Sequence, residues 1–336
     1  MRSDLSAAVD FRVFLVELVY LASGLGERPR GGAIRWGDLP YALDVRRLLE
    51  GRREHAACGL LRAAFDSGLD HSQLLQLGLF ALEPDMTYAG GEPRWSPWGM
   101  ERPDGRERIR ALCEALAAFA RDAGLAGFFR ERAALFASWK SGFDAELAAQ
   151  DHVRVLEEYS GVAPVAPYRV VLSPFLFRET SHVDVSQRAA VTFYPVDEVR
   201  GGSPHWAVRE KGPVFWHELG HWMLDPLAEA HAADIQGLAS IYPGKTGPCR
   251  GSLRMCVIEH TAQALGVRMR LWAAETGKAH GGRPLHPEDL PLIAPVADGL
   301  RAFERDRGRY KTLPDFYPAW LKVFKTARPK PRWWPF

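Results

Sequence analysis

The chain has few cysteines, almost no excess charge and no long apolar run. Its 336 residues include four cysteines and no CxxC pair, which excludes a disulfide-stapled scaffold. Cys249 and Cys256 either bridge locally or stay reduced. Lys and Arg (43) nearly balance Asp and Glu (41), so we expect no nucleic-acid partner and no anionic membrane as the main partner. No stretch reaches the roughly 20 apolar residues that span a bilayer, which predicts a soluble chain.

No secretion signal is visible at the N-terminus. The apolar run from Phe14 to Ala22 is interrupted or flanked by Asp10, Arg12 and Glu17, and the core of a signal peptide does not contain such charges. We interpret the run as an amphipathic helix. The protein is therefore either cytoplasmic or secreted after loss of a leader, and the sequence leaves both open. The sequence does not indicate an oligomeric state.

Helical periodicity dominates the first half of the chain. A hydrophobic content of 47% allows a sizeable core, in one large or two modest domains. Apolar residues recur at three- and four-residue spacing, which is typical of helices. The predicted helices are Val9–Ser23, Leu39–Leu49, Glu54–Phe65, His71–Leu82, Arg106–Arg121 and Leu125–Tyr159. Residues 1–160 are therefore expected to form a helical N-terminal region.

The pattern changes after Tyr159. Glycine and proline residues break the helix, and two runs rich in β-branched and aromatic residues, 168–173 and 190–194, predict strands. Helices then resume. We expect an α+β fold that is predominantly helical, with a small sheet packed on one central helix and an N-terminal helical layer. Residues 161–336 would form a second, catalytic region, unless the chain is one continuous domain.

The segment His217-Glu218-Leu219-Gly220-His221 carries the strongest chemical signal. Residues four apart stack on one face of a helix, so His217 and His221 would present two imidazoles at the separation that tetrahedral zinc requires. Glu218 lies about 100° around the helix from His217, where it can reach a water on the metal without becoming a ligand. The segment predicts a Zn²⁺ site with Glu218 as general base. The alternative is a buried helix with two ordinary histidines.

A third protein ligand must come from elsewhere, because two histidines do not make a stable zinc site. The metzincin pattern is excluded, since Leu224 and Leu227 stand where its glycine and third histidine would be. Glu259 is favoured, because it is a carboxylate inside an otherwise apolar helix and a buried carboxylate needs a strong partner. In the alternative, Glu259 pairs with Arg254 or Arg268.

Other candidate ligands lie between the two helices. Asp225 is one turn past His221 and directly before Pro226, where we expect its short side chain to bond the backbone or the following helix. Three further side chains could be ligands, outer partners of the ligands or a solvated face. They are Glu229, His231 and Asp234.

Several segments, in this order, resemble a bacterial family of HExxH proteins known as a domain of unknown function. They are residues 9–15, 21–24, His55, 68–71, 170–174, 217–221, 225–227 and the helix of Glu259 with Arg268. An HExxH helix followed by a later glutamate also resembles the gluzincin metallopeptidases, whose thermolysin-like fold sets a small sheet over the active-site helix. The resemblance implies a zincin-like fold with His217, His221 and Glu259 as ligands and Glu218 as base.

A peptidase of this kind also needs a donor for the developing oxyanion. Four side chains that lie near the site helices in the sequence are candidates: Tyr242, His260, Arg268 and His280. No spacing rule selects among them, and each has an ordinary structural role as its alternative. Tyr242 is our choice for this catalytic role.

The sequence therefore favours a zinc metallopeptidase that acts on a peptide or protein. An extended substrate would lie along the strand nearest the cleft. The alternative is a catalytically inactive zincin-like protein with a structural metal site and a partner-binding helical region. A third hypothesis keeps the zinc chemistry but changes the substrate to a non-peptide amide or a cell-wall peptide. Glu218→Gln separates the first two hypotheses. In a peptidase, this variant should keep the metal and lose activity, whereas in a protein with a structural metal site it should leave function intact.

Overall fold

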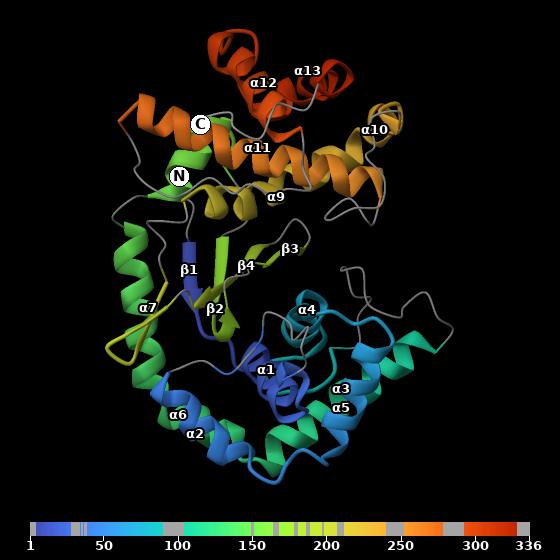
Figure 1. Ribbon diagram of the computed structural model, residues 1–336, viewed down its shortest axis with the longest axis vertical. Coiled ribbons are helices and arrows are strands. Elements are labelled where there is room, and N and C mark those ends of the chain that lie inside the picture. Colours follow the sequence, from blue (N-terminus) through green and yellow to red (C-terminus); the bar gives the residue numbers. More distant parts are fainter. Residues whose placement is uncertain are drawn as a thin grey trace.

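The computed structural model describes most of the chain. The described residues are 5–27, 34, 36, 39–89, 104–148, 151–163, 168–177, 181–185, 189–196, 198–206, 212–239, 252–277 and 292–327. They are mostly helical and include a small sheet, so the fold is of the α+β kind expected from the sequence (Figure 1).

A group of helices forms the N-terminal layer, below the sheet in Figure 1. They are α1 (Phe11–Ala22), the 3-10 turn η1 (Leu25–Glu27), α2 (Pro40–Leu49), α3 (Ala56–Asp66), α4 (His71–Ala81), α5 (Gly105–Asp122) and α6 (Leu125–Glu131). Side chains just before the first turn fix where some of them begin. Asp10 accepts a hydrogen bond from the backbone of Arg12, and Asp70 forms a capping box with Gln73. The five predicted helices from Val9–Ser23 to Arg106–Arg121 are confirmed.

Helix α1 is more deeply buried than an amphipathic helix would be. Its residues from Val13 to Leu21 are all buried, because α1 contacts α3, α4 and α5 as well as β2. A helix that is buried on all sides belongs in a core. The amphipathic interpretation was therefore wrong, and α1 is the central helix of the layer.

The predicted helix Leu125–Tyr159 is divided into α6, α7 (Ala133–Ala148) and α8 (His152–Ser160). Before α8 the chain turns at Asp151, whose φ of 43° is left-handed. Asp tolerates this conformation better than most residues, and its side chain accepts a hydrogen bond from the backbone of Arg154. The helical character was predicted correctly, but the division was not.

The sheet has the strand order β1-β2-β4-β3. Its strands are β1 (Leu5–Ala8), β2 (Tyr168–Phe177), β3 (Ser181–Val185) and β4 (Ala189–Val196), and a separate hairpin joins β5 (Glu198–Arg200) to β6 (Ser203–His205). β2 runs parallel to β1 and β4, whereas β3 runs antiparallel to β4. The two runs predicted as strands are β2 and β4, and β1 lies in the region expected to be helical.

Strand β1 connects the N-terminal region to the sheet. It pairs Leu5 to Ala8 with residues 168–171 of β2. Its sequence, Leu-Ser-Ala-Ala, has little strand propensity, so the pairing with β2 supplies the stability that the local sequence lacks. A strand from the region expected to be helical is therefore part of the central sheet.

The C-terminal helices lie above the sheet in Figure 1. They are α9 (Gly212–Ala230), α10 (Ala232–Gln236), α11 (Leu253–Glu275), α12 (Ile293–Arg305) and α13 (Leu313–Thr326). α9 contacts β3 and β4, packs along α11, and α11 in turn packs on α12. Among the described residues, no helix combines the length and the apolar character needed to cross a membrane.

The cysteines are of two kinds. Cys58 and Cys113 are buried free thiols, whereas Cys256 at the start of α11 is disulfide-bonded. Cys249, the other member of the pair considered from the sequence, lies outside the described residues.

Candidate metal centre

Helix α9 carries both histidines of the HExxH segment on one buried face. His217, Glu218 and His221 have exposed fractions of 6%, 7% and 6%. The Nε2 atoms of His217 and His221 lie 3.2 Å apart, as expected for residues one helical turn apart. The two imidazoles therefore converge on one point.

Helix α11 brings Glu259 to the same point. One carboxylate oxygen lies 3.7 Å from Nε2 of His217, and the other lies 3.8 Å from Nε2 of His221. These three side chains form a group that could hold a metal ion. They come from two helices that only tertiary packing brings together.

Two glycines allow α9 and α11 to approach so closely. A Cβ atom at Gly266 of α11 would overlap the carbonyl oxygen of Pro213 and would lie 3.6 Å from the backbone nitrogen of His217. On the facing helix, a Cβ atom at Gly220 would lie 2.9 Å from the end of the Leu265 side chain. Because neither glycine has a side chain, the backbone that carries Glu259 can lie close to the histidines.

The arginines considered as alternative partners of Glu259 are engaged elsewhere. Arg254 pairs with Glu229 at the surface. Arg268 is buried and binds Glu304 and Glu275, at 2.6 and 2.9 Å respectively. Within the described part of the chain, neither arginine forms an ion pair with Glu259, whose carboxylate faces the two histidines instead.

The polar residues that follow His221 in α9 and α10 do not join the candidate ligands. Asp225 accepts a hydrogen bond from Nδ1 of His221 at 2.9 Å, so the expectation that it bonds the backbone or the next helix was wrong. His231 contacts Asp234 at 3.1 Å. Neither His231, Asp234 nor Glu229 belongs to the group that could hold a metal.

Burial and neighbouring charges shift the pKa values of the three candidate ligands. Burial lowers the pKa of His217 well below its usual range, and His221 adds to this effect. Burial also acts to lower the pKa of His221, but the carboxylates of Asp225, Glu259 and Glu218 raise it to about 10. Burial raises the pKa of Glu259. The 3.2 Å between the two Nε2 atoms therefore fits one shared proton, whose place a metal ion could take.

Two of the four residues considered for oxyanion stabilisation are described by the structure, Arg268 and His260, and both are engaged elsewhere. Tyr242 and His280 lie outside the described residues. Arg268 is held by its two glutamates. His260 is buried, bonds the carbonyl oxygen of Cys256 through Nδ1 and packs against Phe324 of α13. No donor for an oxyanion is therefore assigned from the described residues.

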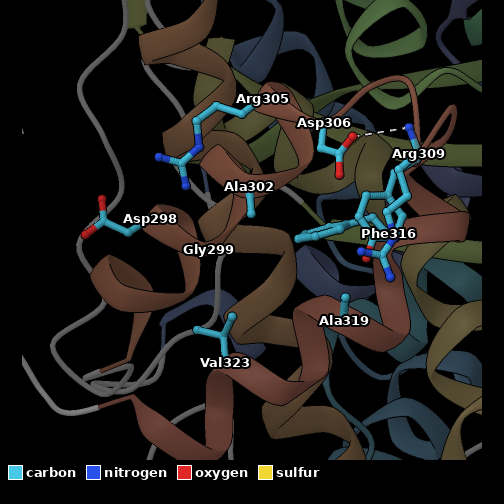
Figure 2. Close-up of a pocket in the computed structure, with 10 residues that line it drawn as sticks. Asp298, Gly299, Ala302, Arg305, Asp306, Arg309, Phe316, Ala319 and Val323 are labelled. Atoms are coloured by element: carbon cyan, nitrogen blue, oxygen red, sulfur yellow. Dashed lines mark hydrogen bonds between the residues drawn. The ribbon is translucent and has the colours of Figure 1, made fainter.

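A groove of about 540 Å³ lies between α12 and α13, and none of the three candidate ligands lines it. Figure 2 shows Ala302 of α12 and Phe316 and Ala319 of α13 around this space, with Arg305 and Arg309 on either side. The groove is a feature separate from the candidate metal centre.

Comparison with known proteins identifies a family. A family model described as a domain of unknown function (DUF4932) matches residues 103–323, which include α9, α11 and the three candidate ligands. No curated protein matches the chain, and no solved structure matches it. Because the matched segment spans more than half of the 336 residues, the chain belongs to the DUF4932 family.

Proposed function

We propose that this protein is a zinc-dependent peptidase with a zincin-like catalytic region. The observation that carries the proposal is the convergence of His217, His221 and Glu259 beside the buried Glu218. Tetrahedral zinc, with ligands at about 2.0 to 2.1 Å, needs ligand atoms about 3.3 Å apart. The separations of 3.2, 3.7 and 3.8 Å are close to this value.

The donor set also fits zinc chemically. Two imidazoles and one carboxylate are a ligand combination of catalytic zinc sites, and they leave a fourth position open for water. The contact behind His221 also suits a zinc site, since Asp225 holds Nδ1 of His221 and leaves Nε2 to face the metal. These features favour zinc over calcium or magnesium, which prefer all-oxygen sites.

Glu218 would act as the general base. A zinc ion held here would supply Lewis acidity, which lowers the pKa of a water molecule toward 7 and polarises a carbonyl group. Glu218 follows His217 on α9 and is close enough to His221 to raise its pKa. Its carboxylate would take a proton from the attacking water and return it to the leaving amine.

The sheet supports an extended peptide as substrate. β3 is the last strand in the order β1-β2-β4-β3, and it contacts α9. Among the described residues, no further strand pairs with the outer edge of β3. An edge of this kind presents backbone groups to which an extended peptide can add as a strand. A peptide bound there would lie next to the HExxH helix.

The test combines zinc stoichiometry with cleavage of a mixed peptide library. We expect wild type to hold one zinc ion and to cleave, and Glu259→Ala to lose the metal. Glu218→Gln should keep zinc while activity falls by about 10²- to 10⁴-fold, the usual contribution of a general base. His231→Ala is the matched control, because His231 contacts a carboxylate on the neighbouring helix outside the site. If zinc-loaded Glu218→Gln cleaves normally, the catalytic role of Glu218 is contradicted. The metal site would then be structural.

A further inference from the structure

The two histidines of the candidate centre differ on the side that faces away from the ligand triangle. Nδ1 of His221 is bonded to Asp225 at 2.9 Å. Nδ1 of His217 is buried and has no carboxylate partner in the described part of the chain. The site therefore has one histidine anchored by a carboxylate and one without such an anchor.

We propose that Asp225 is a positioning residue that fixes the Nδ1-protonated form of His221 and thereby sets the metal affinity of the site. The inference rests on the proposed function, because it assumes that His221 binds the metal through Nε2. A hydrogen bond from Nδ1 to a carboxylate selects the tautomer whose Nε2 lone pair is free, holds the ring plane and makes the imidazole a better donor.

Helix geometry makes this arrangement local to α9. His217, His221 and Asp225 are spaced by four residues each, so they stack along one helix face. The motif is thus longer than HExxH, and its last member supports a ligand without binding the metal. Only 29% of the Asp225 side chain is exposed, and limited solvent access strengthens a charge-assisted hydrogen bond of this kind.

Charge balance gives Asp225 a second effect. A divalent ion held by two neutral histidines and Glu259 keeps one net positive charge in a largely buried place. Asp225 and Glu218 both place negative charge near this ion, and a buried charge is costly unless it is compensated. Loss of Asp225 would therefore weaken metal binding through both ring orientation and charge.

Zinc affinity, measured by competition with a chromophoric chelator, tests the proposal without any assay of activity. Asp225→Ala should bind zinc about 10- to 100-fold more weakly, the range found when outer-shell partners are removed. Asp225→Asn keeps an acceptor oxygen but not the charge, so its affinity should lie between those of Asp225→Ala and wild type. Asp234→Ala is the matched control, because it removes a similar contact with His231 and should leave the affinity unchanged.

Cobalt substitution separates positioning from a general loss of structure. The visible spectrum of bound Co²⁺ reports ligand geometry, and it should change in Asp225→Ala but not in Asp234→Ala. If Asp225→Ala has the zinc affinity and the cobalt spectrum of wild type, the role of Asp225 is overturned, but the proposed function is not. A wild-type protein that binds no zinc would overturn the proposed function and this inference together. Zinc binding that depends on Asp225 in a protein without peptidase activity would overturn only the proposed function.

Discussion

Glu17 makes the stability of this protein depend on pH in a direction opposite to that of most carboxylates. It lies on α1 with an exposed fraction of 0%. The Ser173 hydroxyl donates to one of its oxygens, and the other oxygen has no hydrogen-bond partner in the described part of the chain. Burial raises the pKa of Glu17 from 4.5 to about 8, although the bond from Ser173 acts to lower it.

The pKa shift sets both the sign and the size of the effect. Between pH 4.5 and pH 8 the folded chain keeps a proton on Glu17 that the unfolded chain releases. The contribution of Glu17 to stability is therefore fully present below pH 4.5 and is lost as the pH rises toward 8. Each pH unit inside this window costs up to about 1.4 kcal/mol, so the contribution of Glu17 to the free energy of unfolding should fall by about 3 to 4 kcal/mol between about pH 5 and pH 8.

Glu17→Gln removes this dependence, because an amide of the same shape does not titrate. The free energies of unfolding of wild type and variant should be measured by urea denaturation from pH 5 to pH 9, with a chelator present in both samples. The variant should gain about 3 to 4 kcal/mol relative to wild type between about pH 5 and pH 8 and little above pH 9. Glu131→Gln, at a side chain that is 76% exposed, is the control. Parallel pH profiles for wild type and Glu17→Gln would refute the reasoning.

Three further predictions concern packing and the metal. Gly266→Ala should cost about 1 to 3 kcal/mol and weaken zinc binding, because its Cβ atom would overlap Pro213. Gly142→Ala, in a helical position with open space, should instead be neutral or stabilise by up to about 1 kcal/mol; urea denaturation of both variants checks this. Arg268→Ala should cost about 3 to 5 kcal/mol by leaving the largely buried carboxylate of Glu304 uncompensated, with unchanged zinc stoichiometry by elemental analysis. Zinc at about 100 times its Kd should stabilise wild type by about 2.7 kcal/mol but not Glu259→Ala, and a chelator should reverse the resulting shift in Tm.

Local spacing was sufficient for much of the architecture. The helices of the N-terminal layer and the strands β2 and β4 were predicted because periodicity and residue preference act over a few neighbours. The convergence of His217 and His221 was predictable for the same reason, since a four-residue spacing determines which side of a helix both rings face. The places where local reasoning was wrong are instructive. The start of α8 within the predicted helix Leu125–Tyr159 depends on the unusual backbone of Asp151, and the burial of α1 depends on its neighbours.

The sequence by itself determined which residues could do chemistry, but only the tertiary structure decided which of them meet. Glu259 could be favoured as a ligand from its apolar helix, yet its place beside the histidines depends on how closely α9 and α11 pack at Gly266. The contact between Asp225 and His221 lies within a single helix, but several other partners were equally compatible with the sequence. Tyr242 stays a prediction. Contacts between distant segments arise from the packing of whole elements, and no short stretch of sequence contains that information.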